Sequence, residues 1–303
     1  MSPGTHILVT GGLGFIGSCF VEMALERGYI VTNVDKMTYA SRTDTQFHTN
    51  PHYTLIQKDI SDLETLPSHI AYIINFAAES HVDNSIKSTH AFLKSNVHGV
   101  HNLLELVRKT PSDERPVFIQ ISTDEVYGDI LEGSFSEEDR LKPSNPYSAT
   151  KAAAEELVIG WGRTYKLKYR ITRASNNYGA GQNEEKFIPR IMKLARQNEK
   201  AKIYGNGLQK REWTHTTDHC DGIFLVMEKG VDSEIYNISA GEELTNLEVA
   251  EKVLRAVGKP ADFYELVTDR PGHDVRYSIT CDKIRALGWK PNVTLEHYLS
   301  NIS

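Results

Sequence analysis

Three side chains near the middle of the chain could transfer protons to and from a substrate. The segment ISTDEVYG contains a hydroxyl group, Thr123, followed directly by two carboxyl groups, Asp124 and Glu125. Two neighbouring carboxyl groups in a partly dry pocket rarely both ionise, so the pair can supply one general acid and one general base. The alternative interpretation is that two adjacent acids form a solvated turn.

A tyrosine and a lysine follow at a spacing that suits a helix. Tyr147 and Lys151 lie four residues apart in NPYSATK, and Pro146 can occupy the first turn of a helix. Both side chains would then project from one face, where the lysine can favour the tyrosinate form. A pair with this spacing can equally lie on a solvated surface, so the surrounding chain must decide.

The composition is that of a globular protein. The chain has 303 residues, of which 40% are hydrophobic, and this is enough for a substantial core. A formal net charge of -6 without a run of basic residues argues against a nucleic-acid partner. The N-terminal segment has no basic region and no long apolar stretch, so we expect a cytoplasmic protein without a membrane anchor. The cysteines are few and far apart, which predicts no disulfide and no metal site.

The N-terminal region has the pattern of a dinucleotide-binding unit. An apolar run at residues 6–10 predicts a buried parallel strand that stops at Gly11. Gly14 and Gly17 continue a G-x-x-G-x-x-G spacing, and a helical pattern follows at residues 18–27. Glycines let a pyrophosphate approach the backbone, and the helix N-terminus supplies free N–H groups, so we predict a dinucleotide site here.

Asp35 indicates which dinucleotide binds. It ends a second predicted strand, residues 29–34, and lies 18 residues after Gly17. A carboxylate at this position binds the adenosine ribose diol and repels a 2′-phosphate, which favours NAD over NADP.

Strands and helices continue to alternate up to residue 174. Buried strands are predicted at residues 53–57, 70–78, 117–121 and 169–173, and helices at residues 91–109 and 146–161. The predicted fold class is therefore α/β, a Rossmann-type doubly wound parallel sheet with a smaller mixed α/β lobe for the substrate. We place the NAD-binding domain at residues 1–174 and the lobe at residues 175–303, with some of its segments returning to the first domain.

In the second part of the chain the pattern is mixed. Residues 175–181 are predicted to form a turn, and Thr245 and Glu248 form the capping-box pattern of a helix. Helices are predicted at residues 187–196, 216–230 and 245–257, and short strands at residues 203–207 and 235–238.

Several motifs together resemble those of the nucleotide-sugar 4,6-dehydratases, and most closely the dTDP-glucose 4,6-dehydratases, in the extended short-chain dehydrogenase/reductase superfamily. They extend from Ile7 to about Pro291 and include GGLGFIG, AAESHVD, STDEVYGD, NPYSATKAAAE, TRASNNYG, EKFIP, REW, YNIS and DRPGHDVRY. The resemblance implies a lyase of deoxysugar biosynthesis with tightly bound NAD. Such an enzyme converts an NDP-hexose, in the first instance dTDP-glucose, to the NDP-4-keto-6-deoxyhexose with loss of water.

The resemblance also implies a role for each member of the proton-transfer set. Tyr147, held as phenolate by Lys151, takes the C4 hydroxyl proton, and Thr123 orients that hydroxyl. Glu125 removes the C5 proton, and protonated Asp124 gives its proton to the departing C6 hydroxyl. The 4-epimerases of this superfamily lack the acid pair, so Asp124 separates the two activities.

The same motifs also imply which residues bind the cofactor and the nucleotide sugar. Residues assigned to the cofactor are Gly11, Gly14, Phe15, Ile16, Gly17, Asp35, Lys36, Ser41, Asp59, Ile60, Ala77, Ala78, Ser80, Asn96, Tyr147 and Lys151. Residues assigned to the nucleotide sugar are Ser80, His81, Thr123, Asn176, Lys186, Arg211, Asn246, His273 and Tyr277. Arg211 is the strongest candidate for binding the diphosphate, because a guanidinium can donate two hydrogen bonds to it.

The substrate itself stays open at this point. Departures from the dTDP-glucose enzymes gather around the expected pocket, at Asn84, Ala174, Gly181, Asn183, Glu184, Thr214 and His215. UDP-glucose, UDP-N-acetylglucosamine and a GDP-sugar are alternatives to dTDP-glucose, and a 4-epimerase is the alternative activity.

Two histidine pairs have a spacing that could bind a metal. His215 and His219 lie four residues apart, but no third ligand is evident, and we interpret them as structural. His98 and His101 lie on the helix predicted at residues 91–109. In this superfamily that helix pairs with the one at residues 147–161 across a homodimer interface, so interface packing is the expected role.

Overall fold

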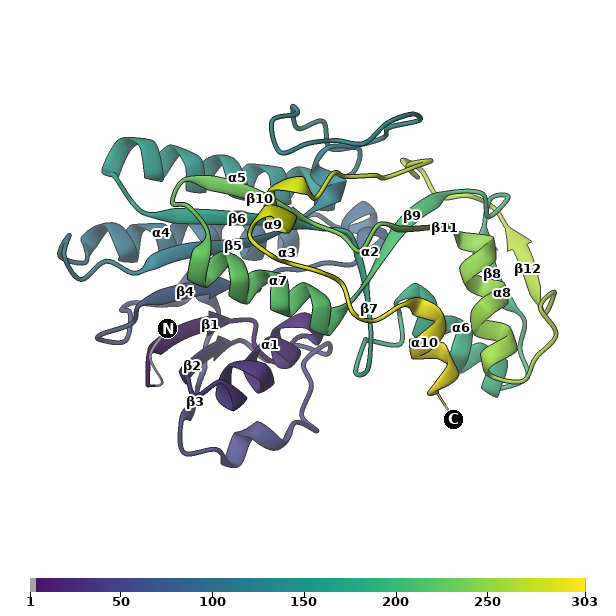
Figure 1. The fold of residues 1–303 in the computed structure, drawn as a ribbon, viewed down its shortest axis with the longest axis horizontal. Coiled ribbons are helices and arrows are strands. Elements are labelled where there is room, and N and C mark those ends of the chain that lie inside the picture. The colour runs from purple at the N-terminus through teal and green to yellow at the C-terminus, as the bar shows by residue number, and fades with distance from the viewer. Residues whose placement is uncertain (1–3, 303) are drawn as a thin grey trace.

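The computed structural model describes residues 4–302 and contains a central parallel sheet of seven strands (Figure 1). The strand order is β10-β6-β5-β4-β1-β2-β3, and every neighbouring pair is parallel. The strands are β1 (His6–Thr10), β2 (Ile30–Asp35), β3 (Tyr53–Gln57), β4 (Tyr72–Asn75), β5 (Val117–Thr123), β6 (Tyr169–Ala174) and β10 (Glu234–Ile238). This confirms the predicted doubly wound α/β fold.

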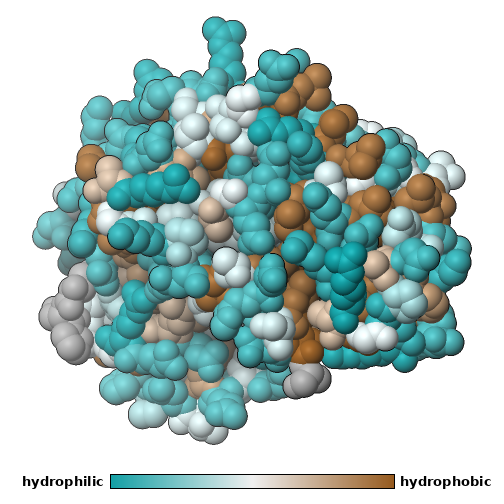
Figure 2. Space-filling model, turned by 45° about the vertical axis from the view of Figure 1, so that its right-hand side comes forward, coloured by the Kyte–Doolittle hydropathy of each residue, from teal (hydrophilic) through white to brown (hydrophobic). Residues whose placement is uncertain are grey.

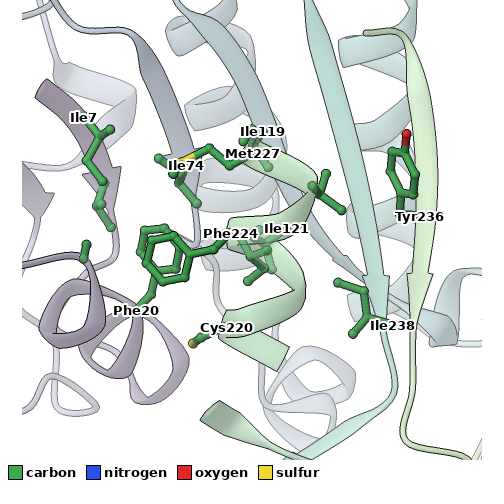
Figure 3. Close-up of a cluster of buried hydrophobic side chains, with 14 of the residues drawn as sticks. Ile7, Phe20, Ile74, Ile119, Ile121, Cys220, Phe224, Met227, Tyr236 and Ile238 are labelled. Carbon is green, nitrogen blue, oxygen red and sulfur yellow. The ribbon is translucent and has the colours of Figure 1, made fainter. Parts of the chain in front are cut away.

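Helices cover both faces of this sheet because its strands are apolar on both sides. In β1, Ile7 and Val9 belong to one buried cluster and Leu8 to another. The first cluster, part of which Figure 3 shows, packs the sheet against α1 (Phe15–Glu26) and α7 (Thr216–Lys229). The second packs it against α4 (Gly99–Lys109) and α5 (Pro146–Tyr165).

A smaller lobe stands beside the carboxyl end of the sheet (Figure 1, right). It contains a sheet of order β11-β9-β7 and a parallel pair, β12 and β8. A third apolar cluster holds this lobe together. Its elements are β7 (Asn176–Tyr178), α6 (Phe187–Arg196), β8 (Ala201–Tyr204), β9 (Lys210–His215), β11 (Glu242–Thr245), α8 (Asn246–Ala256), β12 (Tyr264–Val267) and α10 (Leu295–Ser300).

The chain crosses between the sheet and the lobe more than once. After leaving the sheet at β6 it forms β7 to β9, then returns as α7 and as β10, which pairs with β6. It returns again as α9 (Asp282–Ala286), which contacts β10. Residues after 174 therefore build part of the first domain as well as the lobe.

The helix predicted at residues 91–109 is present but is not regular. A short turn, α3 (His90–Phe92), leads into a π-helical segment, Leu93–His98, before α4 begins. π-Helical segments often occur where a helix serves a functional site. This segment carries Asn96.

Several short elements lie outside the predicted pattern. The strand expected at residues 70–78 is only β4, and β7 lies inside the predicted turn. Strands β9 and β11 were not predicted, because KREWTH and EELT are largely polar and lack a buried apolar run. Helix α2 (Val82–Lys87) was not predicted either, because its sequence VDNSIK has no apolar face. The short helices α9 and α10 and the strand β12 were also not predicted.

The surface seen in Figure 2 is mainly hydrophilic, with hydrophobic residues in small groups. Within residues 4–302, no helix combines the length and the apolar character needed to cross a membrane.

A buried ion pair joins α5 to β6. Arg173 Nη2 lies 2.7 Å from Glu155 Oε2, and the two side chains are 3% and 0% exposed. Arg173 Nη1 also donates to the Tyr127 hydroxyl at 2.6 Å, which in turn donates to Asn237 Oδ1 at 2.9 Å. The pair therefore fixes the helix that carries Tyr147 against β6, the second strand from one edge of the sheet.

Replacing Glu155 should destabilise the protein strongly. Glu155→Ala leaves the Arg173 guanidinium buried without its counter-ion, and we expect the free energy of unfolding to fall by about 3–5 kcal/mol. Urea unfolding followed by circular dichroism measures the change. Glu156→Ala is the matched control, because Glu156 is the exposed neighbour on the same helix. Equal stability of the two variants would contradict the structural role of the pair.

Candidate active site

A cavity of about 470 Å³ lies between the carboxyl edge of the large sheet and the lobe. Parallel α/β sheets bind their ligands at this edge, and the volume is within the usual range for a small-molecule site. All but three of the predicted site residues line the cavity. The three that do not are Asn96, Asp124 and Tyr277.

The glycine turn forms one end of the cavity and leaves no room for side chains. Gly11 has a φ of +68°, and a Cβ atom on it would lie 2.7 Å from the backbone of Ala77. On Gly17, a Cβ atom would lie 2.2 Å from the Gly11 carbonyl oxygen. Helix α1 begins here with Gly14 as its N-cap, and neither a capping side chain nor an acidic residue occupies its first turn. Its free N–H groups suit a pyrophosphate.

Asp35 lies at the end of β2 beside this turn. Its Oδ2 accepts from the Leu13 N–H at 2.9 Å, and its Oδ1 accepts from the Met37 N–H at 2.8 Å. Ser41 Oγ donates to the same Oδ1 at 3.3 Å. These bonds fix the carboxylate at the cavity wall, where it can meet a ribose diol. The site fits the adenosine and pyrophosphate groups of NAD.

The other predicted cofactor residues continue along the same wall. They are Phe15, Ile16, Lys36, Asp59, Ile60, Ala77, Ala78 and Ser80.

Asn96 is buried behind the cavity wall. Its Oδ1 accepts from the Glu79 N–H at 2.8 Å, while its Nδ2 donates to the Glu79 carbonyl at 3.0 Å and to Thr150 Oγ1 at 2.9 Å. The direct contact with the cofactor stays a prediction. The π-helical segment instead places Asn96 where it ties the loop after β4 to the Tyr147 helix.

The acid pair follows directly after β5. Thr123 caps a short 3₁₀ turn, Asp124–Val126, by accepting the Glu125 N–H at 3.3 Å. Its hydroxyl also donates to Asp124 Oδ1 at 3.2 Å. Thr123 and Glu125 line the cavity, whereas Asp124 lies just behind them and is 2% exposed. Within the described chain, Asp124 Oδ2 and Glu125 Oε2 are buried and have no hydrogen-bond partner.

This environment favours a neutral Asp124. Burial raises the pKa of its carboxyl group well above the ordinary value, and the charges of Glu125 and Glu212 raise it further. Burial raises the pKa of Glu125 as well, but the positive charges of Arg211, Arg270 and Lys186 oppose the rise. The two adjacent acids therefore differ in their electrostatic partners, which is what an acid and a base need.

Tyr147 and Lys151 lie at the start of α5, as predicted from Pro146. Asn145 is the N-cap, and it forms a capping box with Ser148. Lys151 Nζ donates to the Ile121 carbonyl at 2.6 Å, and burial lowers the pKa of Lys151 to about 8. Burial raises the pKa of Tyr147, and the charges of Glu125 and Asp124 raise it further, while the nearby Thr123 side chain lowers it.

The predicted phenolate is therefore not favoured by the protein alone. Among the described residues, Lys151 is held by the Ile121 carbonyl, and Tyr147 faces two acids. A positive charge brought in by a ligand would be needed to lower the pKa of Tyr147.

Basic side chains gather at the lobe side of the cavity. Lys186 Nζ donates to the Ser80 carbonyl at 2.9 Å, and burial lowers its pKa. Arg211 donates through Nη2 to the Asp274 carbonyl at 2.8 Å, and its guanidinium carbon lies 4.2 Å from the centre of the Tyr277 ring. Asn176, Asn246, His81 and His273 also line this part.

Tyr277 does not reach the cavity. It is 3% exposed, and its hydroxyl group hydrogen-bonds to Asp274 while its ring supports Arg211. The structure therefore places Tyr277 as a support for Arg211, and its contact with substrate stays a prediction.

Sequence reasoning missed Arg270, which also lines the cavity. Its Nη1 donates to Asp83 Oδ1 at 3.1 Å, and its Nε is buried without a partner within residues 4–302. With Lys186 and Arg211 it makes a third cation suited to a diphosphate. Its place in the DRPGHD motif was the signal that could have identified it.

The two histidines of the predicted structural pair have different surroundings. His215 Nδ1 lies 2.7 Å from Thr217 Oγ1, outside the cavity lining. His219 lies 2.9 Å through its Nδ1 from Asn177 Oδ1, and it does line the cavity. Among residues 4–302, no group of three or more histidine, cysteine or acidic side chains is placed to hold a metal ion.

Comparisons with known proteins agree with this fold. A curated relative from Haloferax volcanii, the low-salt glycan biosynthesis protein Agl12, is 44% identical over 96% of this chain and 94% of its own length. The dTDP-glucose 4,6-dehydratase of Haemophilus influenzae is 41% identical over 97% of this chain and 95% of its own length. The crystal structure of DesIV, a dTDP-glucose 4,6-dehydratase from Streptomyces venezuelae with NAD bound, gives a TM-score of 0.91 at 39% identity. That match covers 97% of this chain and 94% of DesIV.

The fold is that of the extended short-chain dehydrogenase/reductase proteins. Residues 8–302 match the family described as GDP-mannose 4,6 dehydratase, and this chain belongs to that family. The resemblance read from the sequence motifs is confirmed.

Proposed function

We propose that this protein is an NAD-dependent nucleotide-sugar 4,6-dehydratase whose substrate is dTDP-glucose. The observation that carries the proposal is the buried acid pair Asp124–Glu125, capped by Thr123 at the end of β5, beside Tyr147. Oxidation and reduction at C4 alone would need only Tyr147 and Lys151. Loss of water from C5 and C6 needs an additional base and an additional acid, and the pair supplies both.

The residues that would hold NAD are the glycine turn, the first turn of α1 and Asp35. When bound, NAD supplies the hydride acceptor for transient oxidation at C4 and the donor for reduction at C6. Its positive ring is also the kind of charge that lowers the pKa of Tyr147.

The protein side chains then account for the protons. Tyr147 accepts the proton of the C4 hydroxyl as C4 is oxidised. The resulting ketone acidifies the C5 hydrogen, and Glu125 removes it as a proton. Asp124 gives its proton to the C6 hydroxyl, which leaves as water. Glu125 exchanges this proton with solvent and then returns a proton to C5.

Thr123 can carry the proton that restores the starting protonation states of Tyr147 and Asp124. After the reaction Tyr147 holds one extra proton and Asp124 lacks one. The Thr123 hydroxyl donates to Asp124 Oδ1 at 3.2 Å, and Thr123 lies close enough to Tyr147 to lower the pKa of its phenol. A proton can therefore pass from Tyr147 through Thr123 to Asp124 without leaving the pocket.

The substrate end of the cavity is suited to a diphosphate. Lys186, Arg211 and Arg270 approach it from the lobe, and their positive charges act on Glu125 as well. A bound diphosphate would neutralise part of this charge and so strengthen Glu125 as a base. UDP-glucose and UDP-N-acetylglucosamine are the alternative substrates, since the diphosphate contacts do not depend on the base.

A panel of nucleotide sugars in D₂O tests both the activity and the substrate. We expect dTDP-glucose to lose one water molecule and to gain one deuterium at C5, as measured by mass spectrometry and NMR. UDP-glucose, UDP-N-acetylglucosamine and GDP-mannose are the comparison substrates, and the highest kcat/KM identifies the nucleotide. Inversion at C4 without loss of water or uptake of deuterium would show an epimerase and contradict the proposal. Binding without any product would also contradict it.

We also propose that two copies of the chain associate through α4 and α5. Leu93, in the π-helical segment that leads into α4, is 45% exposed. Tyr165, at the end of α5, is 40% exposed. Trp161 lies between the two helices and donates to Glu105 at 2.8 Å. Light scattering should give about twice the chain mass of 34.1 kDa, and Leu93→Glu should shift the protein towards monomer. A wild-type protein of 34.1 kDa would contradict this part of the proposal.

A further inference from the structure

His219 has one ring nitrogen engaged in the protein and one that is not. The residue lies in α7 and is 0% exposed. Its Nδ1 lies 2.9 Å from Asn177 Oδ1. The Asn177 Nδ2 donates to the Ser175 carbonyl at 2.9 Å, and since a carbonyl only accepts, the Asn177 amide is fixed with its oxygen towards the histidine.

This contact defines the protonation of the ring. Asn177 Oδ1 can only accept, so the proton of the imidazole is on Nδ1. Burial lowers the pKa of His219 to about 3, so the ring is neutral at physiological pH. Nε2 is therefore a hydrogen-bond acceptor. It is buried and has no partner among residues 4–302, although the side chain lines the cavity.

The position of His219 indicates which ligand group can meet this acceptor. Asn176 and Asn177 follow β6, whose last residue, Ala174, is paired with Thr123. His219 therefore lies near the end of the cavity that contains Thr123 and the acid pair. Helix α7 packs on α1, and Cys220 Sγ lies 3.8 Å from the carbonyl oxygen of Ile16 in the first turn of α1. This is the cofactor side of the cavity.

We propose that His219 is a cofactor-binding residue whose Nε2 accepts a hydrogen bond from the carboxamide N–H of the nicotinamide ring. The carboxamide is the hydrogen-bond donor that a nicotinamide carries at its reactive end. The bond would fix the rotation of the ring through a chain of contacts from Ser175 to Asn177 to His219. The inference rests on the proposed function, because it takes NAD as the cofactor.

Two substitutions test the roles of the two ring nitrogens of His219 separately. His219→Asn places an amide nitrogen near the position of Nδ1, so it keeps the contact with Asn177 but removes the acceptor at Nε2. His219→Gln extends further and places an amide oxygen near the position of Nε2, so it keeps the acceptor. His215→Asn is the control, because His215 is a neighbouring histidine outside the cavity lining.

Binding to cofactor-stripped full-length protein, measured by calorimetry, is the test. The ligands are NAD, 3-acetylpyridine adenine dinucleotide, which has no carboxamide N–H, and ADP-ribose, which has no nicotinamide. We expect His219→Asn to weaken NAD binding roughly 3- to 10-fold, the equivalent of one hydrogen bond, and to leave the other two ligands unchanged. His219→Gln should retain most of the NAD affinity, and His215→Asn should retain all of it.

Other results would overturn the inference in distinguishable ways. An equal loss for NAD and ADP-ribose would show that His219 only supports the fold. Unchanged NAD binding with weaker binding of dTDP-glucose would assign the acceptor to the substrate. If the wild-type protein bound neither NAD nor ADP-ribose, the proposed function would fail, and the inference with it.

Discussion

The burial of Asp124 beside Glu125 is the constraint on which the rest of the site depends. Water is excluded from Asp124, and the neighbouring acids Glu125 and Glu212 disfavour a further negative charge. A carboxyl group in this position keeps its proton. Glu125 reaches the cavity and meets Lys186, Arg211 and Arg270, which favour its charged form. One strand end thus presents an acid and a base side by side.

The surrounding elements maintain this geometry. Thr123 ends β5 and caps the turn that contains both acids, while the Asn145 capping box begins the helix that carries Tyr147. The buried pair Arg173–Glu155 then joins that helix to β6. Burying an ion pair is costly unless its geometry is good, so this pair is better understood as a specification of position than as a source of stability. The lobe supplies the cations from the other side.

Local patterns in the sequence were sufficient for the sheet, the glycine turn and the start of α5. These features depend on apolar periodicity, on glycine spacing and on a proline, all of which act within a few residues. Features that depend on contacts between distant segments were not predicted. Arg270 reaches the cavity from the lobe, and Asn96 is withdrawn from it by a π-helical segment. His219 had looked like a structural residue because nothing nearby in the sequence marks the cavity that it faces.

The reaction of Glu125→Gln with its nucleotide sugar is the most direct test of the claim that Glu125 is the base and Asp124 the acid. The substitution keeps the shape of the side chain and removes the base, while Tyr147 and Lys151 are unchanged. We expect reduced nicotinamide to accumulate, seen by its absorbance, while no water is lost and no deuterium enters C5. Full dehydratase turnover by Glu125→Gln would contradict the assignment of Glu125 as the base and, with it, the pairing of the two acids.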